Sequence, residues 1–111
     1  RQSGYRTMSR VRLKNRRASI TVKTVWHQGI SRFAFHVTYG YDHDRVREIF
    51  IAGAKEGTML RHILQDAAVI ASIALQHGAT LEELCRSLGR EQDGSMASPL
   101  GVALSYAWEG E

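Results

Sequence analysis

Residues 47–78 place the strongest constraint on how this chain can fold, because they contain a short apolar strand, a glycine-rich turn and one long helical segment in direct succession. The segment 46–52 is rich in β-branched and aromatic residues, which favour a strand. Thr58 follows the glycines and is placed to cap a helix, because its hydroxyl can accept a backbone N–H that has no partner within the helix. We predict that the helix runs to His77 and ends at Gly78, in the left-handed conformation that glycine adopts readily.

Two segments before this unit predict a β-hairpin. Residues 19–27 and 32–39 alternate between apolar and polar side chains, which is the pattern of half-buried strands. Gln28-Gly29 supplies the turn between them, and the polar residues 42–45 supply a second turn before the strand at 46–52. Connections this short favour an antiparallel meander. The aromatic side chains expected in the core of the sheet are Trp26, Phe33, Phe35 and Phe50. Only on an open face of the sheet would they serve as stacking platforms for bases.

The long helix is apolar on more than one side. In its first turns one face is expected to pack on the sheet, and this face consists of Leu60, Ile63, Leu64, Ala67, Ala68 and Ala71. Beyond Asp66 the polar side almost disappears, because Val69, Ile70 and Ile73 join the apolar residues. A helix that is apolar nearly all round is covered on more than one side. The second cover is either the following helices or a partner subunit, and we expect a homo-oligomer, with a dimer favoured.

The C-terminal part of the chain predicts two short helices. Thr80 and Glu83 have the spacing of a capping box, so a helix is expected from Leu81 to about Leu88. Ser98-Pro99 then suits the N-cap and the first position of a third helix.

The predicted fold is α+β, with a three-stranded antiparallel meander packed on one long helix and followed by two short helices. The domain comprises residues 19–111, and a basic extended arm precedes it at 1–18. A chain of 111 residues has room for a single core. Polar residues interrupt its longest apolar run, so no membrane span is expected. The single cysteine and the absence of a leader favour a cytoplasmic location.

Positive charge is concentrated in the first part of the chain. Residues 1–41 contain nine Lys or Arg and no acidic residue, whereas residues 42–111 contain six Lys or Arg and all eleven acidic residues. Such an arm is typical of contact with the phosphates of a nucleic acid, a nucleotide or an acidic partner. It is equally typical of a solvated tail, or of pairing with the acidic half of the fold. The arm residues that we select as phosphate ligands are Arg12, Lys14, Arg16 and Arg17.

The turn before the long helix is the local candidate for an anion site. Lys55, Gly57 and Thr58 bring a lysine and free backbone N–H groups to the positive end of a helix dipole, where a phosphate is stabilised. The same residue types also build many strand-to-helix turns that bind no ligand. We predict that these three residues bind phosphate together with the arm.

The sequence does not combine a nucleophile, a base and an acid into a recognisable catalytic set. The five histidines include no helical pair with the i, i+4 spacing of a zinc site, and Asp42-His43-Asp44 is interpreted as a solvated turn. Cys85 lies among leucines and is expected to pack in the core. We therefore predict no catalytic residues, no metal site and no cofactor.

A set of short motifs runs through the chain in order: Glu48-Ile49-Phe50-Ile51, Lys55, Gly57-Thr58, Ser72, Leu75-Gln76, Gly78 and Leu81-Glu82-Glu83-Leu84. In order and spacing these motifs resemble the TSCPD domain, the module found toward the C-terminus of cobalamin-dependent (class II) ribonucleotide reductases. Residues 12–17 resemble the basic arm that precedes this domain. Residues 98–101 resemble the C-terminal segment of the small stand-alone bacterial members of the family.

The resemblance implies a relative of a reductase module and not a reductase. The Thr-Ser-Cys-Pro-Asp signature, the C-terminal cysteine motif and the catalytic barrel of the reductases are absent from these 111 residues, so metal binding and the reductase reaction are not implied. We expect a non-catalytic binding module that holds a nucleotide or a nucleic acid through its basic residues. The alternatives are a protein–protein interaction module, and an accessory or regulatory subunit of deoxyribonucleotide synthesis that binds a reductase-like protein.

Overall fold

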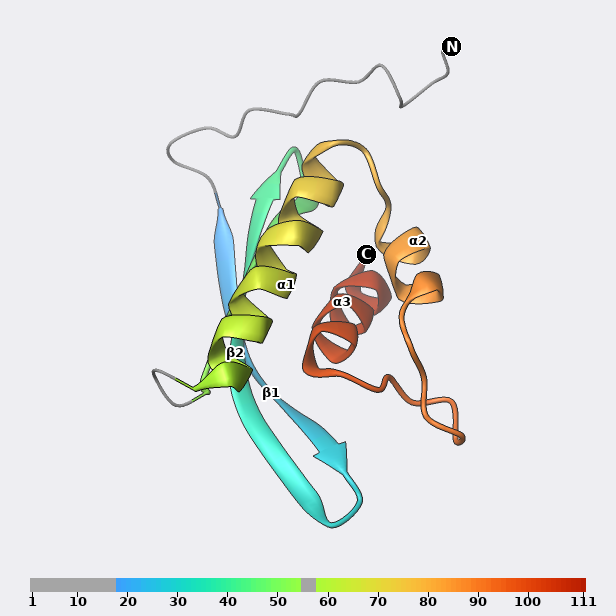
Figure 1. Ribbon diagram of the computed structural model, residues 1–111. Helices are drawn as coiled ribbons and strands as arrows, with labels where there is room; N and C mark the ends of the chain where they lie inside the picture. The colour runs from blue at the N-terminus through green and yellow to red at the C-terminus, as the bar shows by residue number, and fades with distance from the viewer. Residues whose placement is uncertain (1–17, 55–57) are drawn as a thin grey trace.

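Three strands and three helices follow one another along the chain in the computed structural model, which describes residues 18–54 and 58–111 (Figure 1). The strands are β1 (Ser19–Gln28), β2 (Ser31–Asp42) and β3 (Arg45–Ala52). The helices are α1 (Met59–Gln76), α2 (Leu81–Ser87) and α3 (Pro99–Gly110). The predicted α+β class, with a three-stranded meander, one long helix and two shorter ones, is confirmed.

Short turns make the sheet an antiparallel meander in the order β1-β2-β3. Gly29, between β1 and β2, has a positive φ of 59°, which glycine adopts without steric cost. His43 and Asp44 connect β2 to β3, and both have a positive φ, as the two central residues of a type I′ turn do. Each strand therefore pairs with its neighbour in the sequence, as the short connections predict.

One face of the sheet carries the core of the domain. Phe35, Val37 and Tyr39 project from the central strand to this face and are buried. α1 covers it over β3, and α3 lies beside α1 in front of the same sheet (Figure 1). The Tyr39 hydroxyl donates a 2.7 Å hydrogen bond to the backbone carbonyl of Ala103 in α3. This bond ties the last helix to the central strand inside an otherwise apolar layer.

α1 also covers the outer edge of β3. The Ser72 hydroxyl accepts the Ile49 N–H at 2.9 Å and lies 3.2 Å from the Ile49 carbonyl oxygen. The Gln76 amide donates to the Arg47 carbonyl at 3.0 Å, and the Arg47 guanidinium donates to the Leu75 carbonyl at 2.8 Å. Backbone groups at a free edge would otherwise recruit another strand. These contacts satisfy the edge of β3 and fix the position of α1 against it.

Replacing Ser72 by alanine should lower the free energy of unfolding by about 1–3 kcal/mol, because the buried Ile49 N–H loses its partner. Urea denaturation followed by circular dichroism measures the change. The matched control is Ser87→Ala, since Ser87 is exposed and its hydroxyl donates to Glu83 within α2. The control should change the free energy by less than about 0.5 kcal/mol. Equal losses in the two variants would contradict a special role for the edge contact.

The predicted ends of α1 are confirmed, but the prediction of its faces is partly wrong. The apolar residues of α1 that are buried are Leu64, Ala68, Ala71 and Leu75. Leu60 and Ile63, which the sequence pattern assigns to the sheet face, are 43% and 56% exposed. The physical reason is that the contacts of Ser72 and Gln76 with β3 set the rotation of the helix about its axis. That rotation turns a narrow stripe toward the sheet and leaves Leu60 and Ile63 outside it.

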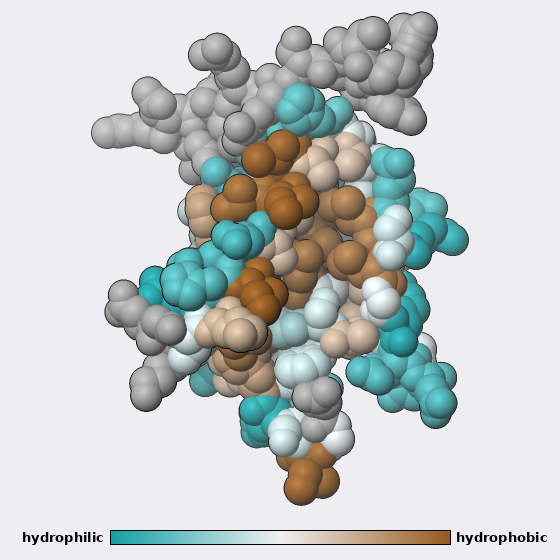
Figure 2. Space-filling view, in the orientation of Figure 1, coloured by the Kyte–Doolittle hydropathy of each residue, from teal (hydrophilic) through white to brown (hydrophobic). Residues whose placement is uncertain are grey.

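The side of α1 that faces away from the sheet is not covered by α2 or α3. Val69 and Ile70 are 53% and 68% exposed, and Ile73 is 37% exposed. Figure 2 shows apolar side chains over much of the length of α1 on the face toward the viewer. Among the described residues, the following helices therefore do not supply the second cover that the sequence predicts. No described helix, α1 included, is long and apolar enough to cross a membrane.

Both short helices begin at the predicted caps. The Thr80 hydroxyl accepts the Glu83 N–H, and the Glu83 carboxylate accepts the Thr80 N–H, each at 3.0 Å. Ser98 caps α3 by accepting the Gly101 N–H at 3.1 Å, and Pro99 occupies the first turn. These caps are local interactions, which explains why the sequence reveals them.

Of the four aromatic residues expected in the core, Phe50 is the exception. Phe35 is fully buried, and Trp26 and Phe33 are partly buried against the core. Phe50 is 54% exposed on the opposite face of the sheet. Successive side chains of a strand point to opposite faces, and both neighbours of Phe50 in β3 are buried, so Phe50 projects outward. The prediction that Phe50 lies in the core is therefore wrong.

Candidate functional site

Most of the predicted phosphate ligands lie outside the described residues. They are Arg12, Lys14, Arg16, Arg17, Lys55 and Gly57. Thr58 is described, and its side chain accepts the Arg61 N–H at 3.2 Å, so it is the N-cap of α1 as predicted. The structure therefore confirms the capping role of Thr58, while its role toward an anion stays a prediction.

The sheet has a second face that no helix of the described residues covers, which we call the open sheet face. It comprises Thr21, Lys23, Val25 and His27 of β1, Arg32, Ala34, His36 and Thr38 of β2, and Phe50 and Ala52 of β3. The strand pairing places these residues in rows across the sheet. Lys23, His36 and Ala52 form one row, and Thr21, Thr38 and Phe50 form the next. The sequence pattern raises an open sheet face with stacking aromatic residues as an alternative, but the alternation predicts two faces without showing which one the helices cover.

The chemistry of the open sheet face is cationic with one exposed aromatic ring. Lys23, Arg32 and His36 are exposed on it, and β1 contains no acidic residue. Glu48, which pairs with Gly40, lies at one end of the face. The hydroxyls of Thr21 and Thr38 are 2.9 Å apart and form a hydrogen bond across the strands. A flat surface with positive charges beside an aromatic ring suits a phosphate backbone with bases that stack.

Both predicted phosphate-binding segments adjoin the open sheet face along the chain. The basic arm leads into β1 at Ser19, which pairs with Gly40 at one end of the sheet. The segment with Lys55 follows directly after Ala52, which pairs with His36 near the other end. In the sequence, β1 follows directly after the arm and β3 comes just before the Lys55 segment, and both strands carry residues of the open sheet face.

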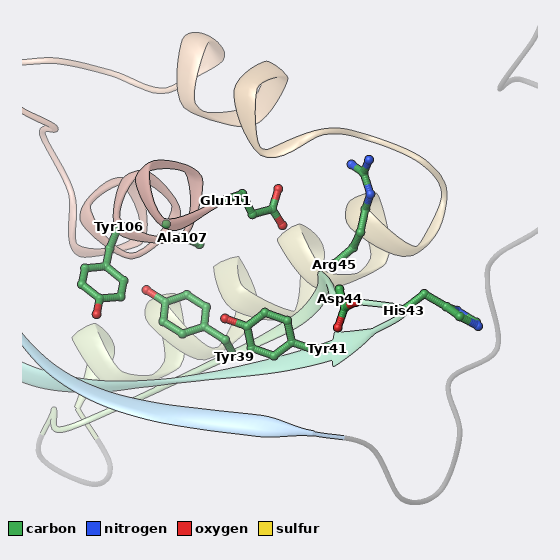
Figure 3. Close-up of a pocket in the computed structure, with 9 residues that line it drawn as sticks. Tyr39, Tyr41, His43, Asp44, Arg45, Tyr106, Ala107 and Glu111 are labelled. Carbon is green, nitrogen blue, oxygen red and sulfur yellow. The ribbon is translucent and has the colours of Figure 1, made fainter.

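A pocket of about 510 Å³ lies on the other side of the sheet, between the β2–β3 turn and α3 (Figure 3). Tyr39, Tyr41 and Tyr106 supply aromatic walls, and the rings of Tyr39 and Tyr106 are stacked with centroids 5.9 Å apart. Arg45 and Glu111 also line the pocket, and the Glu111 carboxylate accepts a backbone N–H of β3 at 3.3 Å. A pocket of this volume is large enough for a small organic molecule.

The polar groups of this pocket do not favour a phosphate. Asp44 and Glu111 bring two carboxylates beside the single guanidinium of Arg45. Burial raises the pKa of the Tyr39 hydroxyl above its ordinary value, and nearby Tyr106 adds to the effect, so this hydroxyl stays protonated and keeps its bond to α3. In Figure 3 the His43 ring points away from the tyrosines. The open sheet face is therefore the better candidate for an anionic ligand.

Cys85 is fully buried in the core, as predicted. Burial raises the pKa of its thiol above the usual value, and the charge of Arg90 offsets only part of this effect. A nucleophilic cysteine needs the opposite shift and access to a substrate. Within residues 18–54 and 58–111, no three His, Cys, Asp or Glu side chains are grouped so that they could hold a metal ion.

The Cys85 thiol should react with Ellman's reagent at pH 8 only when the protein unfolds. The native thiol is both inaccessible and held in its protonated form, so its reaction should be slower than that of the urea-unfolded chain by at least about a hundredfold. Absorbance at low and high urea measures the two rates. Rapid labelling of the folded protein would contradict the buried, unreactive state.

The described part of the chain is a small α+β domain with its helices on one face of a three-stranded sheet and a cationic surface on the other. A scan against protein-family models matches the TSCPD domain over residues 5–107. The chain therefore belongs to the TSCPD domain family, as the motifs predict, and is related to the module found in ribonucleotide reductases. No curated protein and no solved structure matches the chain.

Several of the motif residues that carry the resemblance have a physical role in the fold. Ser72 and Gln76 bond to the edge of β3 and hold α1 in place. Gly78 has a positive φ of 105° after the end of α1, where a side chain would be strained. These family residues therefore build the fold, and they do not form a site with one another.

Proposed function

We propose that this TSCPD domain is a non-catalytic binding module for a phosphate-bearing partner, either a nucleotide or a nucleic acid. The open sheet face and the basic arm together provide the binding surface. The observation that carries the proposal is the exposed ring of Phe50 on a sheet face that also presents Lys23 and Arg32. Exposed aromatic rings stack on bases of any sequence, and the surrounding cations attract the backbone.

The dimensions of the face favour a single strand over a mononucleotide. Along β2, Arg32 and Thr38 are six residues apart, which corresponds to about 20 Å of strand. A ligand that contacts both ends of this face, and the arm as well, is longer than one nucleotide. Single-stranded RNA or DNA fits these requirements, and we place the domain in the cytoplasm, where both are available.

Phe50→Ala should weaken the binding of a fluorescent single-stranded oligonucleotide about fivefold or more, because it removes one stacking platform. Fluorescence anisotropy at low salt measures the dissociation constant. Tyr106→Ala is the matched control, since Tyr106 is 51% exposed on α3 and away from this face. Equal effects of the two changes would contradict the assignment of Phe50. Absence of binding by the unmodified chain at low salt would remove nucleic acid from the proposal, and a parallel titration with a free nucleotide would test the remaining ligand class.

Lys23→Gln should make oligonucleotide binding less sensitive to salt. Each lost phosphate contact lowers the slope of log affinity against log salt concentration by about 0.7 for a single strand. Anisotropy titrations over a range of salt concentrations give this slope. Arg86→Gln is the control, because Arg86 is exposed on α2 and pairs there with Glu82 at 2.9 Å. An unchanged slope for Lys23→Gln would show that this lysine does not contact the backbone.

A protein-interaction role is the second candidate, and the exposed apolar side of α1 favours it. In this role the chain is an interaction module, or an accessory or regulatory subunit of deoxyribonucleotide synthesis that contacts a reductase-like protein. Self-association, with a dimer favoured, belongs to the same proposal. It uses a surface on the helix side of the sheet and does not compete with ligand binding on the open sheet face.

A further inference from the structure

The exposed side of α1 has the spacing of a coiled-coil seam. The six positions that we call the outer seam are Met59, Ile63, Asp66, Ile70, Ile73 and His77. They follow one another at alternating intervals of four and three residues, which is the spacing of paired a and d positions. Met59 is 76% exposed, Ile63 is 56% and Ile70 is 68% exposed, so the apolar part of the outer seam faces solvent (Figure 2). Asp66 interrupts the outer seam near its middle, but soluble monomers seldom expose several large aliphatic side chains along one helix in this way.

A second stripe with the same spacing lies on the opposite side of the helix. Its members are Leu64, Ala68, Ala71 and Leu75, and all of them are buried against the sheet. Because 3.6 residues make one turn, the two stripes lie roughly 180° apart around the helix. The inner stripe fixes α1 on the sheet, so the outer seam is held in a formed helix and points away from the domain. Docking on it requires no folding of the helix.

We propose that the outer seam binds the outer seam of a second copy of this chain, in an antiparallel pair around a twofold axis near Ala68. This inference rests on the proposed self-association and is independent of phosphate binding. In this register Ile63 of one copy packs on Ile73 of the other. Met59 meets His77 at the two ends, and Asp66 lies opposite Ile70. Each of these residue pairs occurs twice in the dimer, because a twofold interface uses the same patch on both subunits.

The position of Asp66 favours the antiparallel orientation of the two copies. A parallel pair would place Asp66 against Asp66, and like charges at a close contact are unfavourable. The antiparallel register replaces this contact by Asp66 against an isoleucine. In addition, α1 has no acidic residue in its first turn and no basic residue in its last turn. At the C-terminal end of α1 the Arg47 guanidinium already donates to the Leu75 carbonyl, and an antiparallel neighbour would add the positive end of its own dipole there.

The length of the seam is suited to a specific dimer. α1 has 18 residues and is about 27 Å long. Large aliphatic side chains occupy four of the six seam positions, and Leu60 and Val69, which are 43% and 53% exposed, flank them. The polar residue Asp66 near the middle weakens the pair but limits the registers that it can adopt. The open sheet faces of the two copies would lie on the two outer sides of such a dimer.

The test is the oligomeric state of the full chain by sedimentation equilibrium. We expect a dimer at about 10 µM, and a monomer up to about 100 µM would overturn the proposal. Ile70→Asp should raise the dissociation constant about 30-fold or more. Asp66→Leu should lower it about tenfold, with the dimer as the largest species, whereas a misfolded chain would form larger aggregates. Phe50→Asp is the matched control on the open sheet face and should leave the dimer intact, whereas dissociation by Phe50→Asp alone would assign the interface to the sheet.

Cross-linking tests the orientation. A mixture of Ile63→Cys and Ile73→Cys chains should form a disulfide-linked dimer under mild oxidation, because these positions face each other in the antiparallel register. Each variant alone should form little of this product, and the native Cys85 is buried. Cross-linking of Ile63→Cys with itself would indicate a parallel pair and contradict the proposal. Oligonucleotide binding by Ile70→Asp distinguishes dimerisation through the outer seam from ligand binding on the open sheet face. This binding should persist when the dimer is lost.

Discussion

The contact between α1 and the edge of β3 is the constraint on which the rest of the structure depends. Ser72 and Gln76 bond to backbone groups of β3 at 2.9–3.0 Å, and Arg47 returns a bond to the helix backbone. Such bonds are directional, so they fix both the position of the helix along the strand and its rotation. Apolar burial alone would tolerate several rotations of a helix that is apolar on two sides. The edge contact selects one of them.

Three consequences follow from that selection. The inner stripe of α1 meets Phe35 and Val37 in the core, and the outer seam turns to solvent. Backbone groups of Arg47 and Ile49 at the edge of β3 bond to the helix, which makes pairing with another strand at these positions unfavourable. Because α1 and α3 both lie on one face of the sheet, no described helix covers the other face (Figure 1). Both candidate binding surfaces thus originate in the same local arrangement.

Local chemistry explains how much of the fold could be predicted from the sequence. Strand alternation, the capping box at Thr80 and the Ser98-Pro99 start depend on residues that are close together in the chain, and these predictions are confirmed. The choice between the two apolar sides of α1 depends on Ser72 meeting Ile49, 23 residues away. The spacing of apolar residues within α1 does not show which of its two apolar sides faces the sheet. The sequence therefore predicts that α1 has an excess of apolar surface, but it assigns Leu60 and Ile63 to the wrong side.

In the candidate site, too, the sequence alone does not show which way a side chain of the sheet points. Phe50 lies in an almost continuous apolar run, in which hydrophobicity does not distinguish one face from the other. The face to which the Phe50 side chain points follows only from the pairing of Thr38 with Phe50 and of Val37 with Ile51. The basic arm stays a prediction from charge alone, because its residues lie outside the described part of the chain. The rows of residues on the open sheet face could not be assigned from the sequence, because they exist only when three strands are paired.

The two surfaces differ in the forces that would hold their ligands, and this difference makes them physically separable. Contacts of Lys23 and Arg32 with phosphates are screened within about 8 Å at physiological salt, and they weaken further as salt is added. Contacts between aliphatic side chains of two outer seams depend on the removal of apolar surface from water, which salts such as sulfate strengthen. A rise in sulfate should therefore release a nucleic acid from the open sheet face while it strengthens the pairing of α1. If both proposals hold, the domain would combine a self-association that salt strengthens with a ligand site that salt weakens, on opposite sides of one sheet.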